Sequence, residues 1–240
     1  MTRNESSPHP VATRRPLPES DEANTFSALI RQRTWGNHAQ AEGEGFIHAL
    51  FRGELTLADY AAMTTAHYFI YQALEATAGP LAEDPIAGPL IHQGLNREDA
   101  LAKDLASLLG AGWQQHITPS PATAAYVARI KTPALDDANA AARHYIAHAY
   151  TRYMGDLSGG QMIRKRLVNH FGFIESDRVA FYEFADLGPL GAFKDTYRAA
   201  LDALPLDEVE QEALITEVVE AYRLNVALFD ELEVQRQAAM

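Results

Sequence analysis

Hydrophobic residues recur every three or four positions along most of this chain, which is the spacing that places them on one face of an α-helix. No stretch alternates hydrophobic and polar residues as a half-buried strand would, and no internal repeat is present. The pattern therefore predicts an all-α protein. We expect helices at about residues 21–42, 46–51, 57–78, 96–109, 121–130, 136–171 and 207–232, with a further helix around residues 194–198.

Prolines, glycines and capping residues set the expected boundaries. Four prolines and several serines fall within residues 1–20, so we expect a flexible leader there and a single helical domain over residues 21–240. Thr56 is a suitable N-cap for the helix that begins at Leu57. Gly43 and Gly45 are expected to end the first helix.

The charge balance and the missing residue types exclude several classes of protein. The chain has 20 Lys and Arg against 32 Asp and Glu, a formal net charge of −12, which disfavours general nucleic-acid binding. It has no cysteine, which excludes disulfides, thiolate nucleophiles and iron–sulfur clusters. No hydrophobic run approaches the roughly 20 residues of a transmembrane helix, and no signal-peptide core is seen. We therefore expect a cytoplasmic protein that binds neither nucleic acid nor membrane.

Residues 150–166, which read Y-T-R-Y-M-G-D-L-S-G-G-Q-M-I-R-K-R, carry three glycines inside an otherwise helix-favouring segment. Each of Gly155, Gly159 and Gly160 costs a helix about 1 kcal/mol relative to alanine. Spacings of three and four place these glycines with Asp156 on one strip of the helix, which has little side-chain bulk and one carboxylate. The strip fits a C-cap followed by a new helix, a close helix–helix contact, or a kinked helix that admits a ligand.

The run Y-T-R-Y-M-G-D-L-S-G-G-Q, residues 150–161, closely resembles the distal-helix signature of the biliverdin-producing heme oxygenases. It departs from that signature at Met154, where leucine is common, and the change conserves hydrophobic character. Further segments resemble the same family in the same order, and the resemblance covers about residues 22–232.

The segment H-A-Q-A-E, from His38 to Glu42, resembles the proximal-histidine segment of that family. A neutral imidazole that binds iron through one nitrogen needs an acceptor for the other, and Glu42 lies one turn away. Arg31 occupies the place where the family usually carries a lysine that faces a heme propionate. The resemblance implies heme b as the bound group, axial ligation of its iron by His38, and a propionate contact from Arg31.

Three later segments extend the resemblance. Y-F-I-Y-Q-A-L-E matches a segment whose second tyrosine, here Tyr71, reaches toward the distal water network. Lys194 and Arg198 resemble the pair of cations that contacts the propionates, and paired cations orient carboxylates. The segment A-Y-R-L-N-V-A-L-F, which ends at Phe229, resembles the closing helix whose aromatic residues line the heme pocket.

The resemblance implies a single-domain fold in which heme lies between a proximal helix and a kinked distal helix. It implies an enzyme that cleaves heme at a meso carbon to biliverdin, CO and ferrous iron, using O2 and reducing equivalents. We assign Asp156, the only carboxylate on the glycine strip, to hold the water network that delivers protons. The expected site residues are Asp156, Gly155, Tyr71 and Arg152 for catalysis, Arg31, Glu42, Tyr150, Gly159, Gly160, Lys194, Arg198 and Phe229 for heme binding, and His38 for the iron.

Other functions compete with this interpretation. A catalytically inactive heme carrier or sensor is one, and the intact Asp156 argues against it. A thiaminase-like enzyme is another, but that family needs a cysteine nucleophile. His144 and His148 are four residues apart, a spacing that can chelate a metal. A di-iron carboxylate bundle needs Glu-x-x-His pairs, however, and no glutamate here precedes a histidine by three residues. We therefore interpret His148 as a buried residue that either supports the site residues from behind or packs in the core, and His144 as structural.

The implied reaction needs an electron donor. Residues 150–166 contain four cationic side chains and one carboxylate, which gives this segment a formal charge of 4 − 1 = +3 in an otherwise acidic chain. We expect a monomer that receives electrons from an external reductase or from an acidic ferredoxin- or flavodoxin-type partner, steered to this basic segment. An ordinary solvated helix face is the alternative. The four cations are Arg152, Arg164, Lys165 and Arg166.

Overall fold

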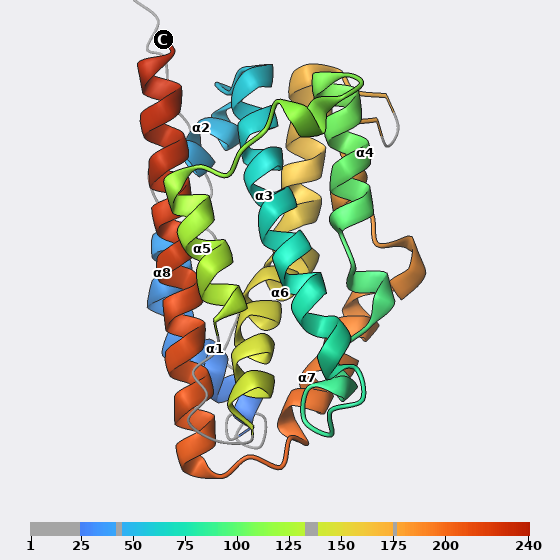
Figure 1. Ribbon diagram of the computed structural model, residues 1–240, viewed down its shortest axis with the longest axis vertical. Coiled ribbons are helices and arrows are strands. Elements are labelled where there is room, and N and C mark those ends of the chain that lie inside the picture. The colour runs from blue at the N-terminus through green and yellow to red at the C-terminus, as the bar shows by residue number, and fades with distance from the viewer. Residues whose placement is uncertain (1–24, 42–44, 133–138, 175–176) are drawn as a thin grey trace, which may run out of the picture.

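The computed structural model describes residues 25–41, 45–132, 139–174 and 177–240, and only the backbone of residues 37–41. Over these residues the chain forms α-helices and short 3-10 turns, with no β-strand, so the predicted all-α class is confirmed (Figure 1). The expected leader at residues 1–20 and Glu42 lie outside the described residues. The helices are α1 (Phe26–Ala41), α2 (Phe46–Arg52), α3 (Leu57–Ala78), α4 (Glu98–Leu109), α5 (Pro121–Lys131), α6 (Ala140–Phe171), α7 (Leu190–Asp202) and α8 (Glu208–Ala238).

Local capping explains why several helices begin and end where the sequence indicates. At the start of α3, Thr56 and Asp59 form a reciprocal capping box, and Asp207 forms a second one with Glu210 at the start of α8. These boxes satisfy backbone N–H groups that a helix start otherwise leaves unpaired. Gly53 ends α2 with a φ of 73°, a left-handed conformation that favours glycine.

The helices pack around two long members, α6 and α8. Helix α8 lies along both α6 and α1, while α3 packs against α4 and α5 and also contacts α6. The ribbon of α6 crosses the middle of the molecule and changes direction near the centre of its length (Figure 1). One continuous hydrophobic core joins these helices, and the faces of α3, α6 and α8 contribute much of it. The site residues expected on these helices are therefore carried by a packed scaffold.

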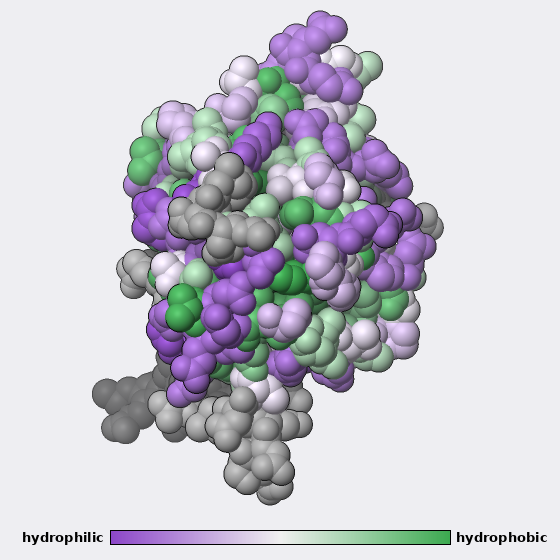
Figure 2. Space-filling view, turned by 60° about the horizontal axis from the view of Figure 1, so that its bottom comes forward, coloured by the Kyte–Doolittle hydropathy of each residue, from purple (hydrophilic) through white to green (hydrophobic). Residues whose placement is uncertain are grey.

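The visible surface is mostly polar. Figure 2 shows one face of the molecule, on which hydrophilic residues predominate and hydrophobic residues form small, separate patches. Large exposed hydrophobic side chains such as Trp35, Met162 and Val209 lie on different helices. Within the described part of the chain, no helix combines the length and hydrophobicity that crossing a lipid bilayer requires.

Candidate active site

The three glycines of α6 have two different environments. The helix continues without a break through residues 155–160, which excludes the C-cap interpretation. A Cβ atom added at Gly155 or Gly159 would meet no described atom within 4 Å, whereas one at Gly160 would lie 3.1 Å from Cδ1 of Tyr182. Gly155 and Gly159 are one turn apart and form a bare, open helix face. Gly160 instead admits the Tyr182 ring, so close packing explains this one glycine and leaves the other two open.

Next to the open glycines, Asp156 is paired with Tyr71 of α3. The Tyr71 side chain is completely buried, and its hydroxyl donates a hydrogen bond to Oδ2 of Asp156. Burial raises the pKa of the Asp156 carboxyl well above its ordinary value. A carboxyl group with a raised pKa retains its proton to higher pH and so can act as a general acid. The structure thus brings two of the predicted catalytic residues together.

Arg152 lies one turn before Asp156 and points into the protein. Its guanidinium carbon is 5.1 Å from the centre of the Tyr71 ring, and its Nη1 donates a hydrogen bond of 2.7 Å to Oδ1 of Asn225 on α8. Burial lowers the pKa of Arg152. The sequence-based charge count treated this residue as part of a basic surface segment. That assignment is corrected here, because the side chain is only 4 % exposed.

Several buried polar atoms around Arg152 have no hydrogen-bond partner among the described residues. They include its own Nε, Nε2 of His67 and the hydroxyl of Tyr126. Burial and the nearby charge of Arg152 lower the pKa of His67, so this imidazole is neutral. Burial raises the pKa of Tyr126 to about 12, which keeps its hydroxyl protonated. Buried polar groups of this kind are usually satisfied by internal water. These atoms therefore suit a water-containing network beside Tyr71.

A short 3-10 turn at residues 180–182 forms a wall of the same region. Buried Asp104 of α4 accepts hydrogen bonds from the backbone N–H groups of Ala180 (2.8 Å) and Phe181 (2.9 Å). Burial raises the pKa of Asp104 to about 6, although these two bonds oppose the shift. The turn places the Phe181 ring 5.3 Å from the Tyr71 ring in an edge-to-face contact. Asp104 therefore fixes the wall against which Tyr71 packs.

A cluster of cations gathers around Tyr150 at the junction of α1, α6 and α7. Burial raises the pKa of the Tyr150 hydroxyl, and the nearby charges of Arg198 and Arg31 lower it. Arg198 also donates a 2.8 Å hydrogen bond to Asp195 at the surface, and such an exposed ion pair exchanges at little cost. Lys194 lies one turn before Arg198 on α7. Three of the predicted propionate contacts, Arg31, Tyr150 and Arg198, thus lie near one another on three different helices.

The remaining predicted residues lie on α1 and α8. Phe229 of α8 stacks on Phe46 of α2, with the ring centres 6.4 Å apart and 22° between the planes. His38 is in α1, which packs against α8 and α7, but its side chain is not among the described ones. Glu42 lies outside the described residues altogether. The roles of His38 and Glu42 stay predictions.

The open glycines give a stability prediction with opposite effects on folding and on ligand binding. Gly159→Ala should stabilise the heme-free protein by about 1 kcal/mol, because alanine is the better helix former and its Cβ has space. The affinity for the heme that the sequence resemblance implies should fall about 10-fold, since the added methyl occupies the bare face. Denaturant unfolding and heme titration measure the two effects. Gly160→Ala is the control, and the Tyr182 contact should prevent the stability gain. A Gly159→Ala protein with unchanged heme affinity would contradict the prediction.

Sequence reasoning missed residues that come to the site from other helices. Asn225, which holds Arg152, stands in the segment A-Y-R-L-N-V-A-L-F as a polar residue on a mostly hydrophobic stretch. A polar residue at such a position could have been recognised in the sequence as a candidate site residue. Tyr126 and Asp104 looked like ordinary residues of amphipathic helices. Only the packing of α3, α4, α5 and α6 reveals that Asp104 binds the 180–182 turn and that Tyr126 is buried near Arg152.

The geometry first defines a class of protein. An open glycine face, a tyrosine–carboxyl pair beside it and a group of cations at one edge suit a flat, anionic ligand that reacts with proton transfer. Comparisons with known proteins agree with this class and make it specific. A family model described as heme oxygenase matches residues 24–231.

Curated relatives and solved structures lead to the same family. Heme oxygenase 1 of Synechocystis is 36% identical over 208 residues, covering 87% of this chain and 85% of that protein. Its crystal structure in complex with heme superimposes with a TM-score of 0.83 at 34% identity, covering 90% of this chain and 95% of that one. The heme oxygenase of Leptospira interrogans superimposes with a TM-score of 0.80 at 30% identity, covering 86% and 99%. The chain belongs to the heme oxygenase family.

Proposed function

We propose that this chain binds heme and cleaves it at a meso carbon to biliverdin, CO and ferrous iron, with Asp156 as the residue that governs proton delivery. The observation that carries this proposal is the hydrogen bond from Tyr71 to Asp156 beside the open face of Gly155 and Gly159. Oxidative ring cleavage consumes protons, and a carboxyl group of raised pKa next to an open ligand face is suited to supply them.

The residues present fit heme as a substrate. The bare glycine face allows a flat ring to approach the backbone of α6, because a Cβ at either glycine would have open space. Tyr150, Arg31 and Arg198 form a cationic edge with a hydroxyl, which suits the two propionates. We propose that His38 of α1 would hold the heme iron. Heme itself supplies the iron that activates O2 and the meso carbon that is oxidised.

The chain's own groups then hold and move protons. The Tyr71 hydroxyl fixes the orientation of the Asp156 carboxyl, and the guanidinium of Arg152 lies over the Tyr71 ring. Asn225 in turn holds Arg152. Burial, together with the nearby charge of Arg152, lowers the pKa of His67 and keeps its imidazole neutral. In this arrangement Asp156 and associated water are the proton source, and Tyr71 and Arg152 position them.

Reconstitution of the purified chain with heme tests the proposal. With ascorbate or a ferredoxin-based reducing system in the presence of O2, we expect the heme absorption to be replaced by that of biliverdin, with release of CO and ferrous iron. The alternative is a heme carrier or sensor that lost activity, and it predicts stable heme under the same conditions. The Tyr71–Asp156 pair favours the enzyme, because a carrier has no need for a poised proton donor. Persistence of heme through repeated reduction would refute the catalytic assignment.

The cationic edge gives a prediction about regiospecificity. Replacing Lys194 and Arg198 together by methionine should allow heme to rotate in its plane, because paired cations no longer hold the propionates. Chromatography of the product should then show several biliverdin isomers, while total turnover falls less than 10-fold. Lys131→Met together with Arg223→Met, two exposed cations on α5 and α8, is the matched control. A single unchanged isomer from the Lys194–Arg198 variant would show that these cations do not clamp the propionates.

We also propose an acidic ferredoxin- or flavodoxin-type protein as the electron donor, docking near the second half of α6. The positive charge there is smaller than the sequence count indicates. Arg152 is buried, and Arg164 forms a 2.7 Å ion pair with Glu183. Lys165 is exposed, and the half-buried Arg166 lies against the backbone of Leu50. The steering charge proposed for this face is therefore mainly that of Lys165 and Arg166. A cytoplasmic location and a monomeric state also stay predictions.

Salt dependence tests the proposed docking. Ferredoxin-supported turnover should fall as ionic strength rises, because a steering interaction is screened over a Debye length of about 8–10 Å near physiological salt. Ascorbate-supported turnover should change little. Lys165→Glu should slow only the ferredoxin reaction, and Lys131→Glu on α5 is the control at a distance from this face. Equal salt sensitivity with both reductants would place the effect in heme binding or chemistry and contradict the docking proposal.

A further inference from the structure

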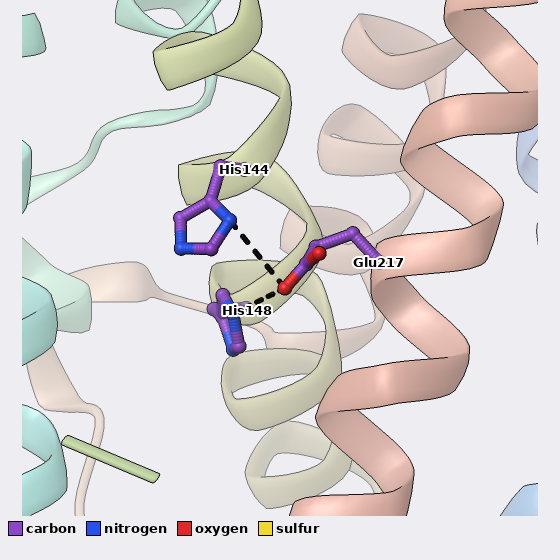
Figure 3. Close-up of side chains that lie close together, drawn as sticks. All are labelled: His144, His148 and Glu217. Atoms are coloured by element: carbon purple, nitrogen blue, oxygen red, sulfur yellow. Dashed lines mark hydrogen bonds and ion pairs between the residues drawn. The ribbon is translucent and has the colours of Figure 1, made fainter. Parts of the chain in front are cut away.

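A second cluster of ionisable side chains lies on α6, two turns before the active-site residues. His144 and His148 of α6 face Glu217 of α8, and their ligand-type atoms all lie within 4.8 Å of one another (Figure 3). The Nε2 atom of His148 is 2.9 Å from Oε1 of Glu217, and the Nδ1 atom of His144 is 3.4 Å from the same oxygen. The side chains of His144, His148 and Glu217 are 4 %, 0 % and 12 % exposed, so the packing of the two helices holds them in place.

The hydrogen bonds around His144 leave Nδ1 available as a ligand. Its Nε2 lies 2.8 Å from the backbone carbonyl oxygen of Arg129, an acceptor that requires the ring proton on Nε2. In the neutral imidazole Nδ1 then carries a lone pair, and this lone pair points toward a carboxylate oxygen. Two electron-rich atoms this close are stabilised by a nearby cation, a role that Arg129 has in this structure and that a metal ion bound between them could take. A histidine that donates its other nitrogen to a backbone carbonyl is also the usual arrangement of a metal ligand.

The cluster has the ligand types that transition metals prefer. Two imidazoles and one carboxylate suit Zn²⁺, Fe²⁺, Co²⁺ or Ni²⁺, and three protein ligands leave coordination positions for water. Ligand atoms bound to one tetrahedral zinc are separated by roughly 3.4 Å, given bond lengths of about 2.0–2.2 Å. The distance of 3.4 Å between His144 and Glu217 already matches this value, and the distance of 2.9 Å at His148 needs to widen by only a few tenths of an ångström.

One group competes for the carboxylate. Arg129 of α5 donates a 2.9 Å hydrogen bond from Nε to Oε1 of Glu217, and its Nη2 donates a second one to Oε2. Burial alone would raise the pKa of Glu217, but the hydrogen bonds from His148 and Arg129 lower it to about 2, so the group is an anion. The Arg129 side chain is 36 % exposed and also lies near Glu220. It can therefore turn outward to Glu220 when another cation occupies the cluster, because that cation then compensates the charge of Glu217.

We propose that His144, His148 and Glu217 form a binding site for a divalent transition-metal ion, with Nδ1 of His144, Nε2 of His148 and an oxygen of Glu217 as its ligands. Binding requires the proton that His148 now donates from Nε2 to move to its unpartnered Nδ1. This interpretation replaces the sequence-based view of the two histidines as packing and structural residues. The spacing of His144 and His148 was visible in the sequence, but the third ligand comes from a helix more than 60 residues further along the chain. The site does not depend on the proposed catalytic activity.

Titration of the heme-free, metal-depleted chain with Co²⁺ tests the proposal. We expect one equivalent to bind with the intense visible absorption of a four-coordinate cobalt site. Zn²⁺ should displace it, and X-ray absorption of the zinc form should show two histidine nitrogens. His144→Gln and Glu217→Gln should each weaken binding at least 10-fold, since each removes one of three protein ligands. His116→Gln, an exposed histidine outside the cluster, should leave the affinity unchanged.

A gain-of-affinity variant keeps the test decisive if a ligand substitution impairs folding. Arg129→Met leaves all three ligands and the Arg129 backbone carbonyl in place but removes the competing guanidinium. Metal affinity should therefore rise several-fold. Arg52→Met, which removes an exposed arginine paired with Glu54 at the end of α2, is the matched control and should have no effect. The absence of a four-coordinate cobalt spectrum in both the wild type and Arg129→Met would overturn the proposal, as would equal affinity in the wild type and His144→Gln.

Discussion

Asp156→Asn is expected to bind heme normally and to lose nearly all biliverdin formation, with a fall of at least about 100-fold. The amide keeps the size of the side chain and can still accept a hydrogen bond from Tyr71, so the pocket should persist. It cannot release a proton, however, and burial has tuned the pKa of the Asp156 carboxyl upward for that role. Single-turnover absorption spectroscopy of the heme complex, followed by product chromatography, measures the loss.

Two comparisons separate proton delivery from a general loss of structure. Tyr71→Phe removes only the hydroxyl that orients Asp156, and its loss of activity should be smaller, about 10-fold. Asp177→Asn removes a carboxylate that forms a surface ion pair with Arg178, and it should be as active as the wild type. If Asp156→Asn formed biliverdin at the wild-type rate, Asp156 would have no part in proton delivery.

His38→Ala is expected to remove the iron ligand and to weaken heme binding by more than roughly 100-fold, because loss of a ligand exceeds the 10–100-fold cost of disturbing its hydrogen-bond partners. Added imidazole should restore the absorption spectrum of a histidine-ligated heme, since the cavity left by alanine admits a free ligand. Heme titration with and without imidazole, followed by absorption and resonance Raman spectroscopy, measures both effects.

A matched histidine substitution controls for nonspecific loss of heme affinity. His116 is exposed in the segment between α4 and α5, and His116→Ala should leave heme binding unchanged. A His38→Ala protein whose heme spectrum equals that of the wild type and does not respond to imidazole would remove His38 from the role of iron ligand.

The order and type of the helices followed from local patterns in the sequence. The helix expected at residues 57–78 has those bounds in the structure, because its N-cap and hydrophobic spacing are both local features. The predicted positions of helix ends that lack a strong capping residue were less accurate. The last helix continues to Ala238, beyond the expected end at residue 232, because the sequence there contains no glycine or proline to stop it. Helix α4 begins at Glu98, two residues later than expected.

The sequence indicated Tyr71 and Asp156 as candidate catalytic residues, but it did not indicate most of their surroundings. Tyr71 and Asp156 came from segments with a family resemblance, and the structure places them in contact. Arg152 was counted as surface charge, because the sequence does not show that α8 covers it with Asn225. Gly160 was grouped with the open glycines, yet it faces the Tyr182 ring. These differences have one cause. The sequence of a helix shows which residues share a face, but it does not show which other helix packs against that face.

The two open glycines have a consequence for protein engineering. Any laboratory selection that rewards heat resistance in the absence of heme should enrich non-glycine residues at positions 155 and 159, because nothing described there blocks a side chain and the helix gains stability. The enriched proteins would be more robust and less able to bind their substrate. Consensus-based or computational stabilisation of this enzyme should therefore keep both glycines fixed and seek its gains at other positions.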